Sequence, residues 1–142
     1  MTTFNTSRQI PASPDEVFAA FTHPERLARW WGPAGFRNTI EVCEFKKGGR
    51  WLLTMHGPDG KNYPSEYAFE EIAPAAKVLV RHVDPPKFTL SITLAPSAAG
   101  TLVSWSQAFE SAEMASRMEA IVVPANEQNL ERLAAEVARH PS

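Results

Sequence analysis

The chain has almost no cysteine and no excess of either charge. Cys43 is the single cysteine among 142 residues, so no disulfide can form within the chain, which agrees with a reducing compartment. The 14 lysines and arginines are interspersed among 16 acidic residues, and the formal net charge is −2. Because a nucleic-acid-binding protein needs a basic stripe to neutralise phosphates, this composition argues against a nucleic-acid partner.

Long apolar runs are missing as well. No window approaches the ~18 apolar residues that a membrane-spanning helix needs, and the first ten residues, "MTTFNTSRQI", lack the charged start and apolar run of a secretory signal. We therefore expect a cytoplasmic protein without a membrane anchor. The length suits one domain over residues 1–142, and the 12 prolines predict frequent breaks between short elements.

The usual signatures of catalysis and cofactor binding are also absent. The four histidines show no metal-ligand spacing; they are His23, His56, His82 and His140. There is no Gly-x-Ser-x-Gly elbow and no phosphate-binding loop, since "KKGGR" at 46–50 is more simply a turn. We interpret Cys43 as a packing residue, because free cysteine is among the most often buried residues. We expect neither a metal nor a cofactor.

Two short helices are predicted after a first strand at residues 3–10. Ser13 and Glu16 form a capping-box pattern that starts the first helix, and "THP" at 22–24 ends it and starts the second. The second helix runs into Trp30 and Trp31. Adjacent helical residues point about 100° apart, so the two rings cannot fill one core site. We expect one ring beneath the small helices and the other at the sheet edge, near a cavity mouth.

From residue 36 onward the apolar period changes to two, which predicts half-buried antiparallel strands. The clearest strand is "TLVSWSQAF" at 101–109, and "GPDG" at 57–60 predicts a hairpin turn after "RWLLTMH". A helical segment begins near Ser111, and Pro124 interrupts it. The final helix, 126–139, has an apolar stripe of Leu130, Leu133, Ala134 and Val137. The residues predicted to lie outside this stripe are Glu131, Arg132, Glu136 and Arg139.

This order of elements predicts an α+β fold, in which the last helix covers one curved antiparallel sheet. Five segments carry a more specific resemblance. They are "IPASPDEVFAAFTHPERLARWWGPAGF", "GGRWLLTMHGPDG", "EIAPAAKVLV", "TLVSWSQAF" and "NLERLAAEVA". In this order they resemble homologues of the activator of the heat-shock protein 90 ATPase, within the START-related, birch-pollen-allergen-like superfamily (SRPBCC), which has the helix-grip fold.

The resemblance implies a seven-stranded sheet around a long C-terminal helix, with two short helices between strands 1 and 2. It also implies a cavity for a small hydrophobic molecule between the sheet and that helix. The superfamily includes lipid carriers, cyclase-like proteins, hormone receptors and the co-chaperone domain, and it shares no common catalytic residue. The eukaryotic co-chaperone has a further N-terminal domain that contacts the chaperone, for which this sequence has no room.

Polar residues on apolar strand faces are the candidate site residues. If Val80 and Trp105 point into the concavity of the sheet, so do His82 and Gln107. Such a side chain costs about 1–3 kcal/mol unless it finds a partner, so it either pairs internally or serves a ligand. The hydroxyl of Tyr67 leaves the same alternatives open. The apolar candidates suit either a pocket or a packed core, and they are Trp51, Met55, Phe69, Phe88, Trp105 and Phe109. Arg117 is the candidate for an anionic ligand group.

Three hypotheses follow, and the leading one is a protein that binds a small apolar or aromatic molecule. The second is a cyclase- or dehydratase-like enzyme in which His82 acts as general acid or base, which requires His82 to face open space. The third is a co-chaperone-like or other protein-interaction module, which a filled interior and an exposed apolar patch would favour. The oligomeric state stays open, with a homodimer among the options.

Overall fold

The computed structural model describes residues 2–139, so His140 lies outside the described residues. Seven strands form one antiparallel sheet in the order β1-β7-β6-β5-β4-β3-β2. The elements in chain order are β1 (Thr2–Ile10), α1 (Pro14–Thr22), α2 (Pro24–Trp30), β2 (Arg37–Cys43), β3 (Arg50–His56), β4 (Asn62–Ala73), β5 (Lys77–His82), β6 (Phe88–Ser97), β7 (Gly100–Phe109) and α3 (Ala112–Arg139).

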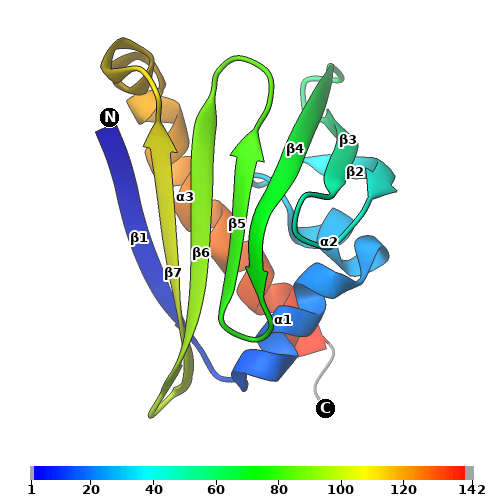
Figure 1. Ribbon diagram of the computed structural model, residues 1–142, viewed down its shortest axis with the longest axis vertical. Coiled ribbons are helices and arrows are strands. Elements are labelled where there is room, and N and C mark those ends of the chain that lie inside the picture. Colours follow the sequence, from blue (N-terminus) through cyan, green and yellow to red (C-terminus); the bar gives the residue numbers. More distant parts are fainter. Residues whose placement is uncertain (1, 140–142) are drawn as a thin grey trace.

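The long helix α3 runs diagonally across one face of the curved sheet, and α1 and α2 lie beside its C-terminal half (Figure 1). The predicted α+β helix-grip arrangement is confirmed. In β7, Val103, Trp105, Gln107 and Phe109 are buried, whereas the residues between them are only half-buried. This alternation places every second side chain of the strand toward α3.

The local signals around the first two helices are confirmed. Ser13 caps α1, because its hydroxyl accepts from Glu16 N at 3.2 Å while Glu16 Oε1 accepts from Ser13 N at 3.1 Å. This capping box satisfies two donors at the start of the helix. α1 ends at Thr22 and α2 begins at Pro24, where the missing N–H of proline costs nothing.

The expected break at Pro124 is wrong. α3 is one continuous helix of 28 residues with Pro124 inside it. An internal proline removes one helical hydrogen bond and costs about 3 kcal/mol. Ala120, whose carbonyl loses its partner, and Pro124 are both exposed, so water can solvate that carbonyl. Buried Val122 before the proline and Leu130 after it hold both halves of α3 on the sheet.

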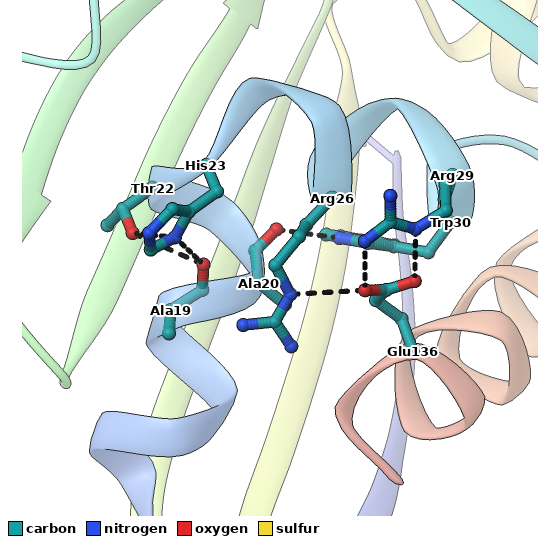
Figure 2. Close-up of polar contacts among 8 residues, drawn as sticks. All are labelled: Ala19, Ala20, Thr22, His23, Arg26, Arg29, Trp30 and Glu136. Carbon is teal, nitrogen blue, oxygen red and sulfur yellow. Dashed lines mark hydrogen bonds and ion pairs between the residues drawn. The ribbon is translucent and has the colours of Figure 1, made fainter. Parts of the chain in front are cut away.

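Glu136 was expected outside the apolar stripe of α3, and this prediction is also wrong, since the side chain is only 2% exposed. Glu136 Oε1 accepts from Arg29 Nε at 2.9 Å, and Oε2 accepts from Arg26 Nε at 3.1 Å and Arg29 Nη2 at 2.9 Å. Figure 2 shows the carboxylate between the two guanidinium groups of α2. The buried charge is tolerated because both of its oxygens are bonded to cations.

Arg132 was likewise expected on the solvent side, but it ties α3 to the segment that follows α2. We call residues 30–36 the tryptophan corner. The guanidinium of Arg132 donates five hydrogen bonds of 2.7–3.2 Å to backbone carbonyls, those of Arg29, Trp31, Gly32, Pro33 and Phe36. The carbonyl of Arg29 lies in the last turn of α2, and the other four lie in the segment between α2 and β2. The Arg132 side chain therefore supplies partners for carbonyls that the helix and the strand ladders do not use.

Trp30 and Trp31 are both buried, at 1% and 4% exposure. Trp30 packs edge-on against Phe21 of α1, and its Nε1 donates to the carbonyl oxygen of Ala20 at 3.0 Å. Trp31 instead packs over the middle of the sheet, with ring centroids 4.7 Å from Trp51 and 5.7 Å from Trp105. The two rings do occupy different sites, but the expectation that one lies at the sheet edge is wrong. The backbone turns to an extended conformation at Trp31, which directs its ring inward.

Candidate functional site

A small, partly open cavity of about 120 Å3 lies between the tryptophan corner, the centre of the sheet and the middle of α3. Its walls come from segments far apart in the sequence. The lining residues are Trp31, Gly32, Pro33, Met55, Tyr67, Phe88, Leu90, Trp105, Gln107, Val122, Ala125, Asn126 and Asn129. None of these side chains carries a formal charge, so the site is suited to a neutral occupant.

Two amide side chains form a polar patch in the cavity wall. Gln107 on β7 and Asn126 on α3 are 7% and 9% exposed, and Asn126 Nδ2 donates to Gln107 Oε1 at 3.1 Å. Within residues 2–139, Gln107 Nε2 and Asn126 Oδ1 have no hydrogen-bond partner. Neither atom is fully buried. The pair therefore leaves one donor group and one acceptor unused in two residues that line the cavity.

Asn129, one turn further along α3, has a different role. Its Oδ1 accepts from Gly32 N at 3.3 Å, and its Nδ2 donates to the carbonyl oxygen of Trp30 at 3.1 Å. Both ends of this amide are thus used by the tryptophan corner. Gly32 itself has φ +94°, and a Cβ at this position would lie 2.8 Å from Met55 Cε, so glycine fits both the backbone and the space.

Tyr67 on β4 is 5% exposed and forms part of the aromatic wall. Its ring stacks on Trp51, with centroids 4.8 Å apart. Burial raises the pKa of the Tyr67 hydroxyl well above its usual value, and a hydrogen bond with the Trp31 side chain opposes this only in part. The hydroxyl therefore stays protonated and neutral across the physiological range.

The indole N–H groups of Trp51 and Trp105 are buried and have no hydrogen-bond partner among the described residues. The Trp105 ring lies beside Trp30 and Trp31, with centroid distances of 6.3 Å and 5.7 Å. Aromatic faces accept weak hydrogen bonds from N–H groups, which lowers the cost of such burial. Because both N–H groups are inaccessible, the polar side-chain groups left for a ligand at the cavity are those of the amide pair and the Tyr67 hydroxyl.

The structure brings together only part of the predicted ligand set. Gln107, Tyr67, Met55 and Trp105 line the cavity. Trp51 and Phe69 lie outside the cavity lining, stacked with centroids 5.7 Å apart. Phe109 belongs to a separate cluster with Ala115 and Val122. The aromatic rings that fill the concave face of the sheet leave a cavity of only about 120 Å3.

His82 does not line the cavity. It is 8% exposed, its Nδ1 donates to the carbonyl oxygen of Pro86 at 2.9 Å, and its ring stacks on Phe88 with centroids 4.8 Å apart. Tyr67 also packs edge-on against the His82 ring, with centroids 5.0 Å apart. A histidine held in this way lacks the open space that the acid–base hypothesis requires.

Arg117 lies on the exposed surface of α3. Its Nη2 pairs with Glu113 Oε1 at 2.6 Å, and the two side chains are 68% and 74% exposed. This is an i,i+4 ion pair on a helix surface, and such pairs contribute about 0.3–0.5 kcal/mol to stability. Arg117 is therefore not placed to bind an anionic group inside the cavity.

Several residues that line the cavity were not predicted as site residues from the sequence. Asn126 and Asn129 precede Leu130 and Leu133 by four residues each, so they lie on the same buried stripe of α3. A polar residue on an apolar stripe is the signal that identified Gln107, and applied to α3 it would have found both asparagines. Leu90 belongs to a strand whose alternation was recognised without a functional role, whereas Phe88 of the same strand was among the aromatic residues suggested for a pocket and does line the cavity.

Within residues 2–139 no three His, Cys, Asp or Glu side chains gather in a way that could hold a metal ion. The helices of that same range include none long and apolar enough to span a membrane. Cys43 is half-buried on β2, and burial raises the pKa of its thiol. The thiol is thus less ionised than an exposed cysteine at neutral pH.

A curved antiparallel sheet that grips a long C-terminal helix, with a small cavity between them, defines a helix-grip protein. The chain belongs to the family described as Activator of Hsp90 ATPase homolog 1-like protein, whose family model matches residues 11–138. The resemblance seen in the sequence is therefore confirmed. Among curated proteins, none matches the chain.

Solved structures share this fold over nearly the whole chain. A protein from Arthrobacter aurescens has a TM-score of 0.88 at 24% identity, covering 97% of this chain and 87% of its own. A protein from Chromobacterium violaceum has a TM-score of 0.82 at 26% identity, covering 95% and 96%. The AHSA1 protein from Silicibacter pomeroyi has a TM-score of 0.77 at 20% identity, covering 98% and 100%.

Proposed function

We propose that the protein binds a small, uncharged, largely apolar molecule in the cavity between the sheet and α3. The main support for this proposal is the amide pair of Gln107 and Asn126 in a largely apolar and aromatic wall. The two amides share one hydrogen bond, and each keeps one unused polar group. Binding pockets commonly combine apolar walls with a few convergent polar groups that orient the ligand. The cytoplasmic location expected from the sequence is part of this proposal.

The size of the cavity limits the ligand. A closed apolar cavity of about 150 Å3 holds benzene, and the cavity of about 120 Å3 is of that order. A single ring fits, with substituents directed to the mouth. Sterols and long fatty acids, which the family resemblance would have allowed, are far larger than this space.

The proposal can be tested by filling the cavity with a larger side chain. Ala125 of α3 lines the cavity, so Ala125→Phe should occupy it and weaken the binding of single-ring probes such as toluene and phenol by at least about tenfold. Binding is measured by ligand-detected NMR titration. Ala120→Phe is the matched control, because it adds the same ring to an exposed position of α3. Equal binding by both variants would contradict the proposal.

A second candidate function is protein binding through α3. Ile121 is 61% exposed, and the exposed Pro124 lies about one turn further along the same face of α3. Val123, at 45% exposure, points to a different side of the helix. Exposed apolar residues that lie together often mark an interaction surface. An Ile121→Ser variant that loses affinity for a heat-shock protein 90 chaperone, while keeping its probe affinity, would establish this candidate.

A further inference from the structure

The amide pair in the cavity wall determines which polar groups a bound ligand must carry. Asn126 Nδ2 and Gln107 Oε1 use one donor and one acceptor on each other at 3.1 Å. Gln107 Nε2 and Asn126 Oδ1 are left over, and both residues line the cavity. If both amides were flipped, the mutual hydrogen bond would persist and the pair would still present one donor and one acceptor. A complementary ligand must therefore carry an adjacent acceptor and donor.

The surrounding walls restrict this edge to an uncharged group. No charged side chain lines the cavity, and the nearby Tyr67 hydroxyl remains neutral because burial raises its pKa. A carboxylate in such a site would lack a cation and would carry no donor, so its burial is costly. A primary amide or a lactam offers a carbonyl oxygen and an N–H on adjacent atoms without charge.

The cavity that the amide pair lines is also lined by aromatic rings. Trp31, Tyr67, Phe88 and Trp105 all contribute rings to the lining, and ring faces favour stacked or edge-on contact with another planar group. We propose that the cavity recognises a neutral, planar, single-ring amide or lactam, whose carbonyl and N–H pair with Gln107 and Asn126. This inference rests on the proposed function, because it names the ligand class of the same cavity.

The probes for the test are 2-pyridone, a lactam the size of one ring, and toluene, which has the same heavy-atom count and no polar group. Addition of 2-pyridone should move a side-chain amide proton of Gln107 or Asn126 downfield and slow its exchange with water, as a new hydrogen bond requires. Toluene in the same cavity should produce only ring-current shifts, without slower exchange, as followed by 1H–15N NMR. Gln107→Met should weaken 2-pyridone binding about tenfold, equivalent to about 1.4 kcal/mol, and leave toluene binding unchanged. Benzoate should bind more weakly than 2-pyridone.

The control variant is Gln9→Met, the same substitution on β1 at an exposed position whose Oε1 accepts from Ser97 Oγ outside the cavity. It should leave both affinities unchanged. If Gln107→Met fails to fold, Asn126→Leu removes the other amide, and the signal shifts in the unmodified protein need no variant.

The two proposals fail in different ways. Toluene binding that Ala125→Phe abolishes, together with 2-pyridone binding that Gln107→Met leaves unchanged, would overturn the amide recognition and keep the cavity as a binding site. Tighter binding of benzoate than of 2-pyridone would overturn it as well. Absence of binding by every probe would overturn both proposals.

Discussion

Two polar groups are buried between α3 and the rest of the protein, and they are satisfied to different degrees. The carboxylate of Glu136 accepts from Arg26 and Arg29 through both of its oxygens. The amide pair joins Gln107 of β7 to Asn126, which lies about three turns before Glu136 on α3. It forms only one hydrogen bond and leaves a donor group and an acceptor unused in residues that line the cavity. Buried polar groups that serve the fold are normally paired in full. The first group therefore belongs to the architecture, and the second is the better candidate for function.

The largest expected effect comes from removing the carboxylate. Glu136→Ala leaves Arg26 and Arg29 without their anion, and breaking a buried ion pair from one side costs about 3 kcal/mol or more. Urea unfolding should show this loss of unfolding free energy. Glu131→Ala, at an exposed position of the same helix, should change it by less than about 0.5 kcal/mol. Similar losses in both variants would contradict an architectural role for the Glu136 carboxylate.

The same carboxylate predicts an acid dependence of stability. Burial opposes ionisation of Glu136, but hydrogen bonds from Arg29 and Arg26 outweigh it and lower its pKa. Because the pKa is lower in the folded state than in the unfolded state, ionised Glu136 stabilises the protein at pH values above the ordinary carboxyl pKa of about 4.3. That contribution is lost as the pH falls through the lowered pKa.

Unfolding free energies measured from pH 7 to pH 3 should therefore fall for the unmodified protein. For Glu136→Gln they should fall less, so the two curves approach each other at the acidic end. Parallel curves over the whole range would show that Glu136 does not titrate as described.

A smaller effect is expected at the tryptophan corner. Arg132 donates to five backbone carbonyls, which the planar fork of arginine allows and the single ammonium of lysine does not. Arg132→Lys should lower the unfolding free energy by about 2 kcal/mol, since hydrogen bonds from charged donors contribute about 1.5–3 kcal/mol. Tryptophan fluorescence should report a loosened corner. Arg139→Lys, near the end of α3, should change neither quantity.

The smallest effect should come from removing the amide pair as a whole. Gln107→Met alone leaves Asn126 Nδ2 without its partner and should cost about 1 kcal/mol. Adding Asn126→Leu removes the unpaired group, so the double variant should return to within about 0.5 kcal/mol of the unmodified protein. A double-mutant cycle in urea checks this. A double variant that loses as much as Glu136→Ala would make the amide pair architectural too.

The fold was predictable because its signals are local and repeated. The capping box at Ser13, the alternation of 101–109 and the hairpin turn at 57–60 depend on neighbouring residues only, and each appears where it was expected. The long helix was predicted in two pieces because Pro124 normally ends a helix. Its solvent-exposed position, which makes the proline tolerable, is a property of the packed structure.

The candidate site was predictable only in part. Alternation along β7 and β4 correctly pointed Gln107 and Tyr67 toward the interior, and both line the cavity. The same alternation pointed His82 inward, but a carbonyl and two rings enclose it. A strand pattern gives the face on which a side chain lies and says nothing about what fills the space in front of it.

The amino-acid sequence by itself determined the elements, their order and the faces they bury, because helix caps, turns and apolar periods act over a few residues. Only the tertiary structure decided the fate of the polar residues on those faces. Glu136 is buried because α2 brings two arginines to it, and Gln107 is half-paired because α3 brings a single amide. These partners are separated from them by 19 to 110 residues along the chain, so no local pattern records the pairing.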